Sequence, residues 1–166
     1  MNILSREKAD LAARIALLSR QAGGAGRAAP SDASSTGPEA ELDRRKILIV
    51  EDEALTALDM ASELEDQGYH IVGTAATSAV AVDLARRMMP DLVLLDITLR
   101  GSVDGIETGR LIREIGLPFV YVTAHADSPT MRRAEALNPR GYLLKPFTPK
   151  QLTAAVEAAL EKGRKS

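Results

Sequence analysis

The sequence predicts an α/β protein in which helices cover both faces of a parallel sheet. From residue 46 onward, short apolar runs alternate with segments of helix length, five times over. The runs LVLLDI and FVYV are apolar at consecutive positions instead of alternate ones, as expected of strands that are buried on both faces. Only 3% of the residues are aromatic, so Val, Ile, Leu and Ala have to fill the core.

Five strand–helix units follow one another along the chain. The predicted strands are residues 46–50, 70–75, 91–97, 118–124 and 141–145, and the predicted helices are residues 54–68, 78–88, 105–116, 129–137 and 149–162. Asp104 and Glu107 have capping-box spacing at the start of the third helix. Gly68 and Gly116 follow helical runs, at positions where a left-handed residue ends a helix most easily.

The fifth helix has the clearest start signal. Thr148 and Gln151 repeat the capping-box spacing, and Pro149 suits the first helical position, where its missing N–H costs nothing. The chain is therefore expected to enter this last helix at residue 149.

Composition excludes several classes of function. The net charge is −2 and the isoelectric point is about 5.7, which argues against a nucleic-acid-binding surface. The chain has no cysteine, so disulfides, thiolate catalysis and cysteine-ligated metals are ruled out. No apolar run is long enough to cross a bilayer, and no secretory signal is present. We expect a cytoplasmic protein without stable membrane insertion.

Charged and hydroxyl side chains follow four of the predicted strands. Glu51 and Asp52 come after the first strand, Asp96 ends the third, Thr123 ends the fourth and Lys145 ends the fifth. Because parallel strands present their carboxyl ends at one edge of the sheet, these side chains should converge. Neighbouring carboxylates repel one another unless a cation lies between them. Oxygen ligands without Cys or His favour a hard dication, and we expect Mg²⁺.

The motifs VEDE, LLDI, VTA and YLLKPF occur in this order, and together they resemble the receiver domain of bacterial two-component response regulators. The resemblance covers roughly residues 46–162. It implies a flavodoxin-like (CheY-like) fold, a doubly wound five-stranded parallel sheet with strand order 2-1-3-4-5. We accordingly expect a receiver domain at residues 45–163, followed by a tail at residues 164–166.

The resemblance also implies a metal-binding phosphoacceptor site. Asp96 would be the phosphoacceptor, and Lys145 would pair with it and then with the phosphoryl group. Mg²⁺ would be held by Glu51, Asp52, Asp96 and the backbone carbonyl of Thr98. A carboxylate can accept a phosphoryl group from phosphohistidine when the charge on the transferring oxygens is neutralised and the groups are in line.

Two further residues would carry the response. By the same resemblance, Thr123 would bind a phosphoryl oxygen, and Tyr142 would change rotamer when the domain is activated. The output would be a changed surface around the fourth helix and the fifth strand. The loop after Asp96 departs from the common receiver pattern, because it is one residue longer and has no proline. His125 is read as a loop histidine and His70 as a structural one.

The expected function is phosphorelay signal transduction by a stand-alone receiver. A sensor histidine kinase or a phosphotransfer protein would donate the phosphoryl group, and a downstream protein would receive the signal, since no DNA-binding output domain is evident. The domain would not be a conventional enzyme, although it would catalyse its own phosphotransfer and slow autodephosphorylation. Two alternatives stay open: a Mg²⁺-dependent phosphohydrolase on a similar fold, and a pseudo-receiver that binds partners without being phosphorylated.

The N-terminal region is predicted to be separate from this domain. Residues 1–21 have the periodicity of an amphipathic helix, with Leu4, Leu11 and Leu18 at intervals of seven, and residues 22–44 have the composition of a flexible linker. The helix could pair with a second copy, dock on a kinase, fold back on the receiver or have no binding role. A homodimer would form through this helix or through the face made by the fourth helix, fifth strand and fifth helix.

Overall fold

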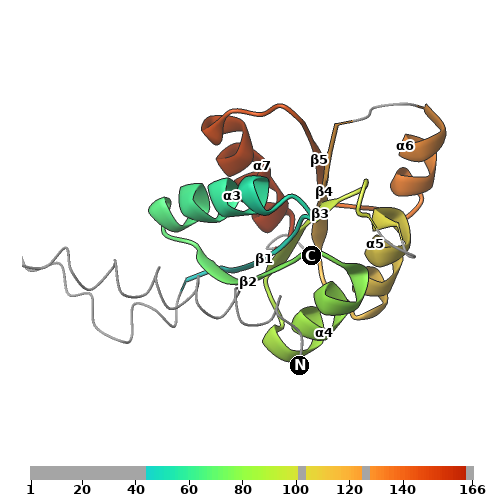
Figure 1. The fold of residues 1–166 in the computed structure, drawn as a ribbon, viewed down its shortest axis with the longest axis horizontal. Coiled ribbons are helices and arrows are strands. Elements are labelled where there is room, and N and C mark those ends of the chain that lie inside the picture. The colour runs from blue at the N-terminus through green and yellow to red at the C-terminus, as the bar shows by residue number, and fades with distance from the viewer. Residues whose placement is uncertain (1–43, 101–103, 125–127, 164–166) are drawn as a thin grey trace, which may run out of the picture. The chain divides into compact units, whose positions relative to one another are not determined.

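The computed structural model describes residues 44–100, 104–124 and 128–163 (Figure 1). Five strands in this part of the chain form one parallel sheet with the order β2-β1-β3-β4-β5. They are β1 (Lys46–Val50), β2 (His70–Ala75), β3 (Leu92–Asp96), β4 (Phe119–Thr123) and β5 (Gly141–Leu144). The predicted fold class and strand order are confirmed.

Helices cover both faces of the sheet. They are α3 (Ala54–Asp66), α4 (Ser78–Met88), α5 (Gly105–Glu114), α6 (Ser128–Glu135) and α7 (Pro149–Lys162). Helices α3 and α7 pack on one face, and α4, α5 and α6 pack on the other (Figure 1). Each strand in the series is thus followed by a helix that returns the chain to the far end of the sheet, which leaves all five carboxyl ends on one edge.

The central strands are apolar at consecutive positions because they serve two cores. In β3, Leu92 and Leu94 face the helices α3 and α7, whereas Val93 and Leu95 face α4 and α5. All four side chains are at most 1% exposed. Burying a side chain of this kind stabilises a fold by about 1.5–3 kcal/mol relative to leaving it in water. The consecutive apolar residues in the sequence are explained by this double burial.

The predicted starts of α5 and α7 are confirmed by the contacts there, whereas α3, α5 and α6 each end two residues before their predicted ends. Thr148 accepts a hydrogen bond from the Gln151 amide, and the Gln151 side chain accepts one from the Thr148 amide, which completes a capping box at α7. The Asp104 carboxylate accepts a hydrogen bond of 2.7 Å from the Glu107 amide at α5. Gly68 follows α3 with a φ of +89°, in the left-handed region that favours glycine.

A tight contact joins α5 to β4. A Cβ atom on Gly109 would lie 2.1 Å from the hydroxyl oxygen of Tyr121, which is fully buried. Only glycine leaves room for the tyrosine at this point of the helix. Tyr121 in turn stacks on Tyr142 of β5, with ring centroids 6.0 Å apart. One aromatic side chain therefore connects α5, β4 and the edge strand.

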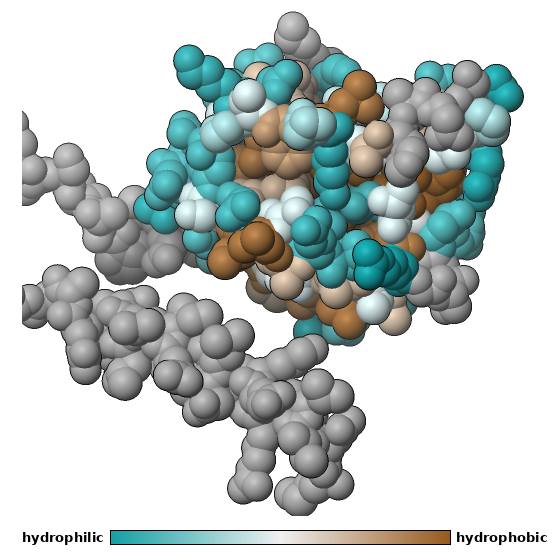
Figure 2. Space-filling model, turned by 45° about the horizontal axis from the view of Figure 1, so that its top comes forward, coloured by the Kyte–Doolittle hydropathy of each residue, from teal (hydrophilic) through white to brown (hydrophobic). Residues whose placement is uncertain are grey.

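The surface carries several separate apolar patches among hydrophilic side chains (Figure 2). Among the described residues, the most exposed large apolar side chains are those of Leu55 and Leu58, which are 65% and 62% exposed. Both lie in the first turns of α3, directly after the predicted acidic site. No helix in the described part of the chain is both long enough and apolar enough to span a membrane.

Some predictions fall on residues outside the described part of the chain. These are the N-terminal helix at residues 1–21, all but the last residue of the linker predicted at residues 22–44, the loop position His125 and the tail at residues 164–166.

Candidate phosphoacceptor site

The strand register brings the predicted site residues to the same level at one edge of the sheet. Val50, the residue before Glu51, pairs with Leu95, the residue before Asp96. Thr123 pairs with Leu144, and the amide of Lys145 then donates a hydrogen bond of 2.8 Å to the Thr123 carbonyl. Segments almost a hundred residues apart in sequence therefore meet at this edge.

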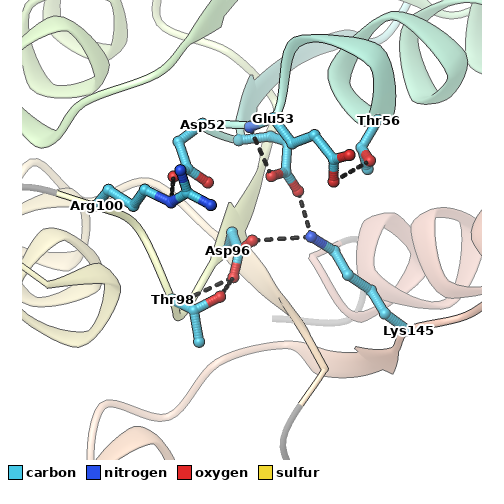
Figure 3. Close-up of polar contacts among 8 residues, drawn as sticks. Asp52, Glu53, Thr56, Asp96, Thr98, Arg100 and Lys145 are labelled. Carbon is cyan, nitrogen blue, oxygen red and sulfur yellow. Dashed lines mark hydrogen bonds and ion pairs between the residues drawn. The ribbon is translucent and has the colours of Figure 1, made fainter.

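Lys145 links two buried carboxylates. Its Nζ donates a hydrogen bond of 2.5 Å to Glu51 Oε2 and one of 2.8 Å to Asp96 Oδ2 (Figure 3). The side chains of Glu51 and Asp96 are each 3% exposed, and that of Lys145 is 20% exposed. Two carboxylates this close and this well buried would repel each other strongly without the ammonium group between them. The peptide bond that follows Lys145 is cis.

Thr98 holds the second oxygen of Asp96. Its amide and its hydroxyl both donate to Asp96 Oδ1, at 2.7 and 2.8 Å (Figure 3). Burial by itself would raise the pKa of Asp96, but the hydrogen bonds from Lys145 and Thr98 outweigh it and lower the pKa below its ordinary value. Asp96 is thereby kept ionised, with both oxygens oriented by donors, and an ionised carboxylate is the form that acts as a nucleophile.

Glu51 differs from Asp96 although the two share a cation. Burial raises the pKa of Glu51 above its ordinary value and outweighs the hydrogen bonds from Lys145 and the Glu53 amide. Of the two carboxyl groups, Glu51 is thus the one that takes up a proton more readily as the pH falls. The surroundings of Glu51 and Asp96 therefore shift the pKa values of these two carboxyl groups in opposite directions.

Three carboxylates form a group that could hold a metal ion. Oxygen atoms of Glu51, Asp52 and Asp96 all lie within 4.8 Å of one another. They line a cavity of about 630 Å³, together with Glu53, Thr98, Arg100, Ala124 and Lys145. Carboxylate and other oxygen ligands suit a hard divalent cation. The predicted convergence of Glu51, Asp52, Asp96 and Lys145 is therefore found in the structure.

The start of α5 packs closely against the backbone around Asp96. The Gly105 amide donates a hydrogen bond of 3.1 Å to the Ile97 carbonyl. A Cβ atom at Gly105 would lie 2.0 Å from the carbonyl oxygen of Asp96 and 2.6 Å from the Cα atom of Ile97. The helix can approach the segment around Asp96 this closely only with glycine at position 105.

The two predicted switch residues lie beside the cavity and do not line it. Thr123 ends β4 and is fully buried, while Ala124, the next residue, reaches the cavity. Tyr142 lies in β5 and packs into the core on the face covered by α4, α5 and α6. Burial raises the pKa of Tyr142 above its ordinary value. The switch roles of Thr123 and Tyr142 stay predictions.

The hydroxyl of Tyr142 is buried without a hydrogen-bond partner among the described residues. An unsatisfied buried hydroxyl costs about 1–3 kcal/mol, so Tyr142→Phe should raise the free energy of unfolding, by about 1 kcal/mol. Urea unfolding of the wild type and the variant measures this change. Tyr121→Phe is the matched control, because the Tyr121 hydroxyl donates to the Ile106 carbonyl at 3.5 Å and its removal should bring no gain. A Tyr142→Phe variant no more stable than wild type would contradict the expectation.

Arg100 is a site residue that the sequence pattern did not predict. Its Nε lies 3.3 Å from Asp52 Oδ2 (Figure 3). Arg100 is thus the second cation, after Lys145, that contacts the cluster of three carboxylates. The two hydrogen bonds from the Thr98 amide and hydroxyl to Asp96 were not predicted either, while the role of the Thr98 carbonyl as a metal ligand stays a prediction. A basic residue four positions after a strand-end aspartate was the available signal for Arg100, but most surface arginines are only solvated charges.

Comparison with known proteins supports one family. The model of the response regulator receiver domain matches residues 47–157. The transcriptional regulatory protein PdtaR of Mycobacterium tuberculosis is 38% identical over 133 residues, which cover 78% of this chain and 64% of PdtaR. The DNA-binding response regulator MtrA of Mycobacterium leprae is 35% identical over 122 residues, which cover 72% of this chain and 52% of MtrA. The chain thus spans less than two thirds of the length of these relatives.

Solved structures agree with the sequence relatives. The signal receiver domain of a modulated diguanylate cyclase from Desulfovibrio desulfuricans G20 superposes with a TM-score of 0.69 at 38% identity, covering 74% of this chain and 98% of that chain. A CheY-like receiver domain protein from Methanospirillum hungatei JF-1 has the same TM-score at 23% identity, which shows the fold alone. The chain belongs to the response regulator receiver domain family of two-component signalling proteins.

Proposed function

We propose that this domain accepts a phosphoryl group on Asp96 from a sensor histidine kinase or a phosphotransfer protein and passes the signal on through protein contacts. The observation that carries the proposal is the state of Asp96: a buried carboxylate, ionised because Lys145 and Thr98 lower its pKa, at the floor of a solvent-accessible cavity. The proposed pairing of this domain with a histidine kinase follows the general behaviour of the family. The setting we propose is the cytoplasm.

The carboxylate group fits a magnesium ion. Glu51, Asp52 and Asp96 offer hard oxygen ligands within 4.8 Å of one another, and no His or Cys belongs to this group in the described part of the chain. We propose that these three residues, with the backbone carbonyl of Thr98, hold Mg²⁺. When bound, the ion would neutralise negative charge on the phosphoryl oxygens during transfer.

The residues of the chain itself have separate tasks in the proposed transfer. An Asp96 carboxylate oxygen attacks the phosphorus atom of phosphohistidine, a P–O bond forms, and the P–N bond breaks with its electron pair left on the imidazole. Lys145 contacts Asp96 before transfer and would pair with the added phosphoryl oxygens afterwards. Thr98 holds Asp96 Oδ1 through two hydrogen bonds, which limits the orientations of the nucleophile.

The proposed response starts at the end of β4. Thr123 is the hydroxyl residue that precedes the cavity residue Ala124, and we propose that it binds a phosphoryl oxygen. Movement of Thr123 would change the packing available to Tyr142 and so alter the surface of α6 and β5. The exposed Leu55 and Leu58 beside the cavity offer an apolar contact for a donor protein. A homodimer through α6, β5 and α7 is a further proposed use of the output face.

Phosphorylation of the intact chain tests this function. With a small phosphodonor and Mg²⁺, the wild type should acquire an acid-stable, base-labile phosphate, and Asp96→Asn should acquire none because no acyl phosphate can form. Asp83→Asn is the matched control: it removes an aspartate from the exposed surface of α4 and should label like the wild type. Equal labelling of Asp96→Asn would refute the assignment. Steady hydrolysis of small phosphate esters over many turnovers would indicate a phosphohydrolase instead.

A further inference from the structure

The cluster of three carboxylates, Glu51, Asp52 and Asp96, is contacted by two side-chain cations on opposite sides. Lys145 contacts Glu51 and Asp96, and Arg100 contacts Asp52, with Nε 3.3 Å from Oδ2. Figure 3 shows the guanidinium of Arg100 against Asp52, across the group from Lys145. Among the described residues that line the cavity, these are the two with positive charge. Each of the three carboxylates is thus paired with a side-chain cation.

The two cations are held very differently. Lys145 is 20% exposed and bridges two carboxylates that are each 3% exposed, so its position is tightly determined. Arg100 is 94% exposed and contacts only one carboxylate, that of Asp52, which is 18% exposed. Moving the guanidinium into solvent costs little, because exposed ion pairs contribute little stability. Lys145 is a fixed part of the site, whereas Arg100 can be displaced.

We propose that Arg100 is a tethered counter-cation that competes with a divalent ion for Asp52 and so sets the Mg²⁺ concentration at which the site fills. This inference rests on the Mg²⁺ site of the proposed function. A dication at the three carboxylates, with Lys145 in place, already balances their charge. A guanidinium left against Asp52 would then face the dication as a like charge, which is unfavourable. Binding of the ion therefore includes release of Arg100.

The expected size of the effect follows from the exposure of the pair. An exposed ion pair is worth up to about 1 kcal/mol, which corresponds to about a fivefold change in a binding constant. Arg100→Gln should therefore lower the Mg²⁺ dissociation constant by about threefold to fivefold. Arg100→Lys keeps the charge on a side chain of similar reach and should stay close to the wild type.

The experiment is a titration of the intact protein with MgCl₂ at constant ionic strength, followed by ¹H–¹⁵N NMR. Arg87→Gln is the matched control, because Arg87 forms an exposed ion pair of 3.0 Å with Asp83 on α4 and its replacement changes the net charge equally. It should bind Mg²⁺ like the wild type. In an Asp52→Asn background, Arg100→Gln should no longer alter the residual affinity, since the competition is for that carboxylate.

A second measurement compares the free energy of unfolding of the variants without and with Mg²⁺. In chelator, urea unfolding should show Arg100→Gln and Arg87→Gln to be about equally stable, since each loses one exposed ion pair, and added Mg²⁺ should then stabilise Arg100→Gln more by mass action. If Asp52→Asn weakens Mg²⁺ binding but Arg100→Gln and Arg87→Gln bind alike, the magnesium site stands and the role of Arg100 is wrong. If Mg²⁺ shifts no resonances of the site in either the wild type or Arg100→Gln, the magnesium site of the proposed function fails as well.

Discussion

Lys145→Met is expected to slow phosphoryl transfer to Asp96 by about a hundredfold or more and to lower the free energy of unfolding by about 3 kcal/mol near neutral pH. The variant leaves Glu51 and Asp96 buried side by side with no ammonium group between them. It also removes the charge that would stabilise the transferring phosphoryl oxygens. Transfer rates with a small phosphodonor and urea unfolding measure the two effects.

The stability loss in Lys145→Met should depend on pH in a defined direction. Without Lys145, the pKa values of Glu51 and Asp96 both rise, because burial then acts without its main opposing contact. A carboxyl group with a raised folded-state pKa favours the fold below its unfolded pKa, and this benefit is lost as the pH rises through the folded pKa. In the wild type, Asp96 has a lowered pKa, and its contribution is lost as the pH falls. The deficit of the variant should therefore shrink between about pH 7 and about pH 5.

Lys150→Met is the control for these measurements. Lys150 lies on the exposed surface at the start of α7 and has the same charge and length as Lys145. It should transfer phosphate and unfold much like the wild type at both pH values. A Lys145→Met deficit that is constant with pH would mean that repulsion between Glu51 and Asp96 is not its cause.

Gly105→Ala is expected to lower the free energy of unfolding by about 3 kcal/mol and to impair phosphorylation of the remaining folded protein. The added methyl group would lie 2.0 Å from the backbone carbonyl of Asp96 and 2.6 Å from Ile97 Cα. Because these are backbone atoms, the end of β3 or the start of α5 has to move. Either movement displaces Asp96 from Lys145 or Thr98.

Gly141→Ala provides the comparison. Gly141 lies in β5, and a Cβ atom there would meet only a methyl group of Val120, at an ordinary distance of 3.9 Å. Its stability should change by less than about 1 kcal/mol. Urea unfolding and phosphodonor labelling of the two variants separate a local clash from a general intolerance of alanine at glycine positions. Similar stability of both variants would show that the α5–β3 contact yields without cost.

The fold was predictable because patterns among consecutive residues indicate its main features. Fully apolar strands such as Leu92–Leu95 indicate burial on both faces, and the alternation with helix-length segments indicates parallel connections. Parallel strands then bring Glu51, Asp96 and Lys145 to one edge whatever their separation in sequence. This part of the site depends on topology alone.

The remaining features depend on side-chain rotamers and loop paths, which no residue pattern specifies. The double contact of Thr98 with Asp96 requires a particular turn after β3, and the Arg100–Asp52 pair requires that the loop run back across the carboxylates. The Tyr142 ring stacks on Tyr121, and its buried hydroxyl has no hydrogen-bond partner among the described residues. Such contacts are decided by tertiary packing after the sheet has formed.

The close fit between Gly109 and Tyr121 limits the order in which these two positions can change during evolution. Glycine inside a helix costs about 0.5–1 kcal/mol of stability relative to alanine. Helix propensity alone would therefore favour replacement of Gly109 by alanine. While Tyr121 is present, its hydroxyl fills the space that the new methyl group needs. A lineage that first replaces the tyrosine by a smaller residue opens most of this space, and alanine then requires only a small shift of the Phe119 ring, 3.3 Å from the new Cβ atom. Gly109→Ala as the first change would clash with Tyr121. The residue tolerated at this helix position therefore depends on the side chain in the neighbouring strand.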